Sequence, residues 1–185
     1  TSTPKKHPLP PVGWAIIIGA ALLLGIGIWY YNRLNTNDWR HVSKVGIRLP
    51  MKYQIHGIDV SKHNGRINWA QLRAMRFEDL RLQFTFIKAT EGTSLQDKDF
   101  KNNWQQADEV GLYRGAYHFY IPWKPAAPQF ENFKRVAKLK KGDLPPVLDF
   151  EIGTNAFSRE QIIQNIRTWL IMAENHYGVR PIIYT

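Results

Sequence analysis

Two carboxylates one residue apart are the clearest candidates for chemistry in this sequence. Asp149 and Glu151 lie in the segment LPPVLDFEIG, residues 144–153, which is otherwise largely apolar and strand-like. Side chains alternate along a strand, so both acids are expected on one face and Phe150 on the other. A neighbouring charge raises the pKa of one acid in such a pair, and that acid then holds a proton near neutral pH. Glycoside hydrolysis needs a proton donor of this kind beside a second carboxylate.

Further polar side chains stand at the ends of other strand-like runs. They are Asp59, Thr90, Glu91 and His118. The carboxyl ends of parallel strands meet at one edge of a sheet, where functional groups gather. We therefore expect these residues to join the acid pair. The alternative is structural: Lys or Arg partners would neutralise the pair, and Asp59 would cap a turn.

Aromatic side chains gather at the ends of the same runs. They are Tyr113, Tyr117, Phe119, Tyr120, Trp123 and Tyr184. Aromatic faces suit sugar rings, which have apolar C–H faces and hydroxyl rims. The competing interpretation is ordinary packing in the core or in loops.

No metal or cofactor is expected. The histidines that accompany Asp59 lack the close spacing of a metal-binding helix; they are His56, His63 and His118. Lys88 is expected to be paired or to extend toward solvent rather than to form a Schiff base. No Gly-x-Gly-x-x-Gly follows a strand-like run, which argues against a dinucleotide site, and the absence of cysteine excludes thiol chemistry.

A repeating strand–helix rhythm must position these residues. Apolar runs occur at 55–60, 84–90, 113–120, 145–151 and 180–185. Helical patterns lie between them, with Asn68 as an N-cap, Gly111 as a stop and a possible capping box at Ser158 and Gln161. The step of roughly 30 residues is that of a βα unit and predicts a mainly parallel sheet. A barrel and an open doubly wound sheet both fit.

The N-terminal part has a different composition. Residues 12–31 carry no charge and are long enough to span a bilayer core of about 30 Å as a helix. Aromatic residues flank the run, which predicts an uncleaved transmembrane anchor, the alternative being a cleaved signal peptide. A short tail, 1–11, precedes the anchor and a basic stalk, 32–54, follows it. Residues 1–54 hold seven Lys or Arg against one acid, so the charge of +10 is concentrated there and does not favour nucleic acid as a partner.

Several motifs resemble one enzyme family. They are GIDVSKHNG at 57–65, FIKATEGTSLQD at 86–97, GAYHFY at 115–120, LPPVLDFE at 144–151 and PIIYT at 181–185. In this order and spacing they resemble the family 25 glycoside hydrolases, the muramidases of the Chalaropsis lysozyme type. The resemblance covers residues 55–185.

The resemblance implies an α/β fold, an irregular TIM-like (β/α) barrel, and cleavage of the β-1,4 bond between N-acetylmuramic acid and N-acetylglucosamine. Glu151 would be the proton donor, Asp149 would stabilise or orient the sugar, and Asp59 would complete the acidic site. The expected substrate-binding residues are Glu91, Tyr117, Phe119 and Tyr184. Members of the family continue beyond PIIYT through further strands, so the resemblance also implies an incomplete barrel in this chain.

Together these observations predict a peptidoglycan hydrolase held in the bacterial inner membrane by residues 12–31. Its catalytic domain, 55–185, would face the periplasm or the cell wall, and its partners would be glycan strands. One rival is a wall-binding module without catalysis, which needs the aromatic groove but no acid pair. Another is a metal-dependent polysaccharide deacetylase, against which the histidine spacing argues.

Overall fold

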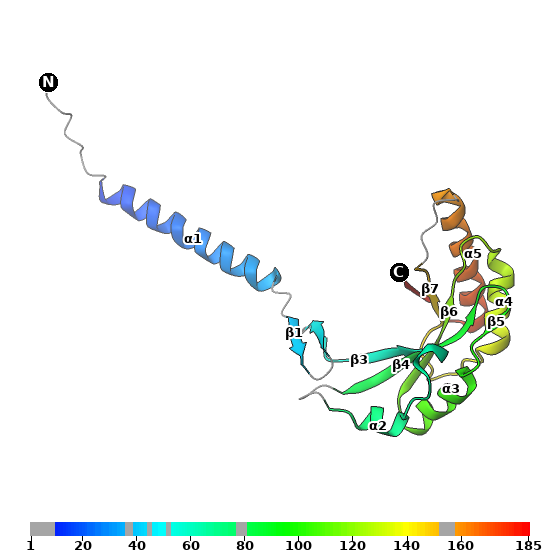
Figure 1. Ribbon diagram of the computed structural model, residues 1–185. Helices are drawn as coiled ribbons and strands as arrows, with labels where there is room; N and C mark the ends of the chain where they lie inside the picture. Colours follow the sequence, from blue (N-terminus) through cyan, green and yellow to red (C-terminus); the bar gives the residue numbers. More distant parts are fainter. Residues whose placement is uncertain (1–9, 36–38, 44–45, 51–52, 77–80, 152–157) are drawn as a thin grey trace. The chain divides into compact units, whose positions relative to one another are not determined.

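A computed structural model describes residues 10–35, 39–43, 46–50, 53–76, 81–151 and 158–185. The chain divides into two compact units, Thr1–Tyr53 and Gln54–Thr185 (Figure 1). Most of the predicted N-terminal tail lies outside the described residues. The basic residues Lys44 and Lys52 of the predicted stalk also lie outside them.

The first unit begins with one long apolar helix, α1, Pro11–Asn35. Its segment Pro11–Arg33 has a mean hydropathy of 2.2, and none of its most apolar window is buried within the structure. Near the end of α1 the guanidinium of Arg33 lies 5.2 Å from the centre of the Trp29 ring. By length and composition α1 is suited to span a membrane. A secretion signal near the N-terminus has the same properties.

The predicted basic stalk is more ordered than the sequence pattern indicates. It contains an antiparallel hairpin of strands β1, Trp39–Val42, and β2, Ile47–Pro50. The backbone N–H of Gly46 donates to the carbonyl of Val42 at 2.9 Å, and Gly46 has φ +68°. Each strand has only four residues, which is too short for a period of two to stand out in a charged segment.

The second unit is built on a mainly parallel sheet with strand order β3-β4-β6-β7-β8. These strands are His56–Val60, Leu82–Glu91, Tyr113–Phe119, Val147–Asp149 and Ile182–Tyr184. They confirm the five strand-like runs of the sequence. A sixth strand, β5, Leu95–Gln96, pairs antiparallel with β4 and has only two residues, too few to predict from sequence.

Helices occupy the connections, as the sequence pattern predicts. They are α2, Trp69–Ala74; α3, Phe100–Glu109; α4, Ala126–Val136; and α5, Arg159–Tyr177, with a short 3-10 turn η1, Lys62–Asn64. The Asn68 side chain accepts from the Gln71 N–H at 3.0 Å, which confirms the predicted cap. The capping box of Ser158 and Gln161 is also present. These caps satisfy backbone donors that a helix N-terminus leaves free.

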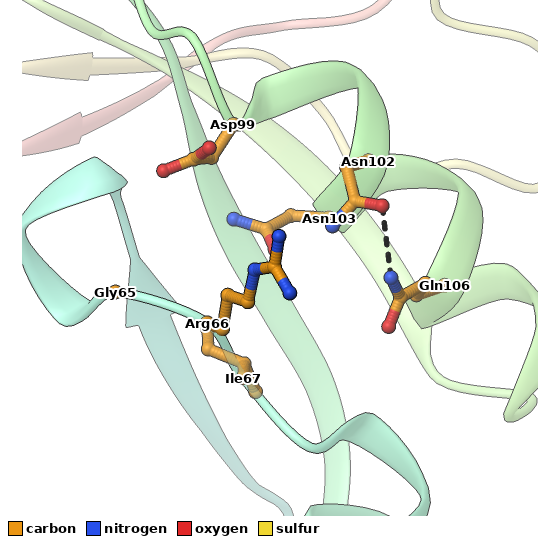
Figure 2. Close-up of a pocket in the computed structure, with 7 residues that line it drawn as sticks. All are labelled: Gly65, Arg66, Ile67, Asp99, Asn102, Asn103 and Gln106. Carbon is orange, nitrogen blue, oxygen red and sulfur yellow. Dashed lines mark hydrogen bonds between the residues drawn. The ribbon is translucent and has the colours of Figure 1, made fainter.

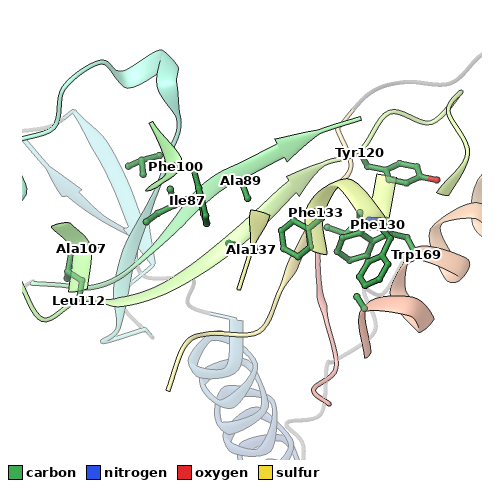
Figure 3. Close-up of a cluster of buried hydrophobic side chains, with 14 of the residues drawn as sticks. Ile87, Ala89, Phe100, Ala107, Leu112, Tyr120, Phe130, Phe133, Ala137 and Trp169 are labelled. Atoms are coloured by element: carbon green, nitrogen blue, oxygen red, sulfur yellow. The ribbon is translucent and has the colours of Figure 1, made fainter. Parts of the chain in front are cut away.

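The core lies between one face of the sheet and helices α3, α4 and α5 (Figure 3). Ile87 and Ala89 of β4 belong to it, and neither is exposed to solvent. Phe133 of α4 and Trp169 of α5 pack with ring centres 5.5 Å apart. Because Ile87 and Ala89 face the helices, Phe86 and Lys88 must face the other side of the sheet. That second side, the inner face, is available for a site.

Two glycines leave room for aromatic rings on the inner face. A Cβ on Gly57 of β3 would collide with the ring of Phe84, and one on Gly115 of β6 would collide with the ring of Phe86. Each ring belongs to β4, the strand between β3 and β6. The two rings also contact each other edge to face, with centres 5.6 Å apart.

The sheet does not close into a barrel within the described residues. Strand β8 pairs with β7 on one side, and all three of its residues are exposed. The α/β class and the parallel sheet of the sequence prediction are confirmed. The architecture in this chain is an open half-barrel.

Candidate active site

The inner face carries a pocket of about 390 Å³, which we call the inner-face pocket. Six of the seven predicted site residues line it: Asp59, Tyr117, Phe119, Asp149, Glu151 and Tyr184. The seventh, Glu91, does not. Sequence reasoning missed Ser61 and His63 as lining residues, although both lie in the GIDVSKHNG motif directly after Asp59.

Strand register explains why distant segments meet here. Glu91 pairs in register with Phe119, Phe119 with Asp149, and Asp149 with Tyr184. These residues therefore form one row across β4, β6, β7 and β8. Parallel strands in register bring residues from the ends of separate sequence runs to the same level of the sheet.

Asp149 occupies the enclosed part of the pocket. Only 9% of it is exposed, and its Oδ1 has no hydrogen-bond partner. Burial raises the pKa of Asp149 to about 6, and the charges of Glu151 and Asp59 act in the same direction while Lys88 opposes them. A carboxyl that is half-protonated near pH 6 and has a free oxygen is suited to bind a polar group of a ligand.

Glu151 lines the same pocket but is exposed to solvent. The residue between the two acids, Phe150, packs against the core, and its ring centre lies 6.2 Å from that of Tyr120. The alternation predicted for the segment is therefore confirmed. The two acids share a face but differ in environment, one enclosed and the other open to water.

The Tyr117 hydroxyl is affected by the charges of two of the acids, Asp59 and Asp149. Tyr117 is largely buried, and burial raises the pKa of its hydroxyl, with further increases from Asp59 and Asp149. A hydrogen bond with Ser61 acts in the opposite direction. The phenol therefore stays protonated and can donate a hydrogen bond within the pocket.

Lys88 and Glu91 form an ion pair, with Nζ 2.8 Å from Oε2. The Lys88 ammonium also lies 4.5 Å from the centre of the Phe119 ring. The expectation that Lys88 is paired is confirmed. Glu91 is joined to the pocket through its ion pair with Lys88, which is a lining residue.

Thr90 and His118 lie on the core side of the sheet and not in the pocket. Thr90 Oγ1 is 2.7 Å from His118 Nδ1, and Gln129 Oε1 is 3.3 Å from His118 Nε2. Their expected membership of the acid constellation is therefore wrong. For Thr90 the cause is a β-bulge between Lys88 and Thr90, which shifts the alternation of β4 and which no sequence signal marks. His118 faces the core through the regular alternation of β6, in which its neighbours Tyr117 and Phe119 line the pocket. In the described parts of the chain, no three His, Asp or Glu side chains are grouped as metal ligands.

Asp97 fixes the loop that follows β3, which carries the pocket-lining residues Ser61 and His63. Its Oδ2 accepts from the Lys62 N–H at 2.9 Å and its Oδ1 from the Asp99 N–H at 2.9 Å. It therefore joins η1 to the segment that leads into α3. Ser61 begins η1 and closes a capping box with Asn64, which fixes the turn locally.

Comparison with known proteins shows the family to which this fold belongs. The model of the glycosyl hydrolases family 25 matches residues 58–185. The chain belongs to this family. A solved family 25 glycosyl hydrolase from Bacillus anthracis superposes with a TM-score of 0.67 at 36% identity, over 72% of this chain and 61% of that one. The half-barrel is thus part of a family 25 fold.

Two family relatives show how much of a family member's length this chain covers. The uncharacterized protein YegX of Escherichia coli K12 is 44% identical over 166 residues, 86% of this chain and 61% of YegX. Lysozyme M1 of Streptomyces globisporus is 33% identical over 140 residues, 71% of this chain and 46% of the lysozyme. The chain therefore spans about half to three fifths of the length of these relatives.

Proposed function

We propose that this family 25 domain hydrolyses the β-1,4 bond between N-acetylmuramic acid and N-acetylglucosamine in peptidoglycan. The observation that carries the proposal is the pairing of an enclosed acid, Asp149, with a solvent-exposed acid, Glu151, in one pocket. Family membership supports the reaction class. The aromatic side chains of Phe119 and Tyr184 supply faces against which sugar rings can stack.

In the proposed mechanism Glu151 donates its proton to the glycosidic oxygen as the C–O bond breaks. This role rests on the match of Glu151 to the proton donor of the family, because the raised pKa in this structure belongs to Asp149. The leaving sugar departs with a hydroxyl group, and positive charge develops at C1 of the sugar that remains. A water oxygen then bonds to C1, and the proton that the water loses restores Glu151 to its protonated form. The free Oδ1 of Asp149 accepts the acetamido N–H of that sugar and turns its carbonyl oxygen toward C1. The ionised form of Asp149 also stabilises the developing positive charge.

The remaining lining residues have supporting roles in this proposal. Asp59 adds a third carboxylate, and the Tyr117 hydroxyl donates to substrate oxygen. Lys88 lowers the pKa of Asp149 and so favours its ionised form. Glu91, which holds Lys88 through the ion pair, contributes to substrate binding indirectly.

The test uses purified cell walls and measures the release of reducing sugar. Glu151→Gln and Asp149→Asn should each reduce turnover by about two orders of magnitude or more, since each removes a group needed at the transition state. Glu174→Gln, an exposed acid on α5, is the matched control and should retain full activity. Mass spectrometry of the products should show reducing-end N-acetylmuramic acid. Wall binding without turnover would instead support a binding module, and loss of activity with chelators would support a deacetylase.

We further propose that α1 remains in the mature protein as a single-pass anchor in the inner membrane, with the domain facing the periplasm or wall. The length and hydropathy of α1 support this. So do its terminal aromatics, Trp14 at one end and Trp29 to Tyr31 at the other. An anchor would keep the enzyme close to an insoluble polymer. Intact-mass measurement of the membrane fraction after alkaline extraction should find α1 still attached, whereas a cleaved, soluble product would identify a signal peptide.

A further inference from the structure

A second pocket, the α3 pocket, has about 350 Å³ and takes no part in the chemistry described above. It lies between the loop after η1 and the first turns of α3 (Figure 2). Gly65 and Arg66 line this pocket, while Ser61 and His63 line the inner-face pocket. The single turn η1 therefore separates the two pockets along the chain.

The α3 pocket contains one charge of each sign. Arg66 extends from its loop toward α3, and Asp99 stands at the start of that helix (Figure 2). Both line the pocket, yet within the described residues their side chains form no ion pair with each other or with another group. Two opposite charges that stay unpaired in one cavity are suited to a ligand with both charges.

A buried donor in the same wall lacks an acceptor. Asn103 is 2% exposed, and its Oδ1 accepts from Trp69 Nε1 at 3.3 Å. The indole N–H can only donate, so it fixes the orientation of the Asn103 amide. The Nδ2 of Asn103 is then a buried donor without a partner. A buried donor of this kind is costly unless a ligand or an ordered water supplies the missing acceptor.

Two further amides complete the wall. Gln106 Nε2 donates to Asn102 Oδ1 at 2.9 Å, which leaves Asn102 Nδ2 and Gln106 Oε1 available. The α3 pocket therefore offers donors from Arg66, Asn102 and Asn103 and acceptors from Asp99 and Gln106. This combination matches a group with a carboxylate and an ammonium close together.

We propose that the α3 pocket binds a zwitterionic amino-acid head group. Arg66 and Asn103 donate to its carboxylate, and Asp99 accepts from its ammonium group. The source of the ligand rests on the proposed function: the peptides of peptidoglycan present such head groups on their uncrosslinked diamino acids. Binding there would select the peptide side chain while the inner-face pocket holds the glycan.

The test follows the side-chain amide of Asn103 by ¹H–¹⁵N NMR in the full chain in detergent micelles. Three probes share a chain of five carbons but differ in the charged groups at its ends. They are meso-diaminopimelate with both groups, pimelate with carboxylates only and pentane-1,5-diamine with ammonium groups only. We expect saturable shifts with meso-diaminopimelate, and binding weaker by about tenfold or more for the other two.

Variants assign the two charges. Arg66→Gln should weaken binding of meso-diaminopimelate by about tenfold or more. Asp99→Asn should weaken it too, but should strengthen binding of pimelate, because a repulsive carboxylate is removed. Lys101→Gln, an exposed residue of α3 that does not line the pocket, is the control and should change neither affinity.

Absence of saturable shifts with meso-diaminopimelate, or equal binding of all three probes, would overturn the proposal. The readout does not depend on glycan cleavage. Binding in a chain that fails to cleave walls would support the α3 pocket and count against the proposed hydrolase. Cleavage of walls without binding of meso-diaminopimelate would support the proposed hydrolase and count against the α3 pocket as a binding site.

Discussion

Lys88 and Glu91 lie three residues apart in one strand, yet their side chains meet in an ion pair of 2.8 Å. Residues three apart in a regular strand point to opposite faces. The bulge between Lys88 and Thr90 changes this, because two residues of β4 then turn toward the core in succession. The irregularity thus brings a carboxylate to the one lysine that lines the inner-face pocket.

Glu91→Gln should destabilise the fold by about 1–3 kcal/mol, because it leaves a largely buried ammonium without its counter-charge. Urea unfolding measures the change. In a double-mutant cycle with Lys88→Met, the effect of Glu91→Gln should nearly disappear. An equal loss of stability in both backgrounds would show that Glu91 acts on something other than Lys88.

Asp149→Asn should make the protein more stable at neutral pH while strongly reducing hydrolysis. The folded state raises the pKa of Asp149 from 3.8 to about 6, so it binds this proton more tightly than the unfolded state does. Ionising Asp149 therefore lowers stability as pH rises from about 4 through 6. Removing the charge should raise the free energy of unfolding by up to about 3 kcal/mol at pH 7.

This gain should vanish near pH 3, where Asp149 is protonated in both states. Urea unfolding across the pH range provides the measurement, and Glu174→Gln is the matched control. A variant that is less stable than the parent at pH 7 would show that the carboxylate has a stabilising partner.

His118 should make the fold sensitive to acid. Burial lowers its pKa from 6.5 to about 4, with Lys88 acting in the same direction and Gln129 and Glu91 opposing. The unfolded state then takes up the proton first, so stability is complete above pH 6.5 and falls as pH drops toward 4. The expected loss is about 3 kcal/mol.

Asp149 changes stability in the opposite direction between pH 4 and 6, so the measurement belongs in the Asp149→Asn background. There the free energy of unfolding should decrease steadily from pH 6.5 to pH 4. Adding His118→Gln should remove most of this slope. A slope that persists without the imidazole would assign the acid sensitivity to other groups.

Gly115→Ala should destabilise the protein by about 1–3 kcal/mol, because the new methyl group meets the Phe86 ring and lies 3.0 Å from Leu144 Cβ. Thermal unfolding measures the loss. Phe86→Leu should cost less in the presence of Gly115→Ala than alone, since the smaller side chain relieves the collision. Additive losses would show that the ring and the glycine are not in contact.

Local patterns in the sequence account for much of this structure. Asn68 and Ser158 mark helix starts by chemistry that acts within three residues, and the apolar runs mark the five parallel strands. The placing of Asp149 and Glu151 on one face follows from strand alternation alone. Such features depend on neighbours along the chain, which a sequence displays directly.

Features set by contacts between distant segments were not predictable. The bulge in β4 turns Thr90 toward the core, where its hydroxyl bonds to His118 of β6. The α3 pocket depends on how the loop at Arg66 meets helix α3. Neither segment carries a local signal of this contact, because it arises only when β3 and β4 pair.

The two hydrogen bonds of Asp97 have a consequence for motion. One carboxylate is shared by the backbone of Lys62 and that of Asp99, so the loops at these positions cannot fluctuate independently without breaking a bond to a charged group. The loop after β3, which lines the inner-face pocket, and the start of α3, which lines the α3 pocket, should therefore show correlated displacements. A polymer bound across both would meet a surface of constant dimensions.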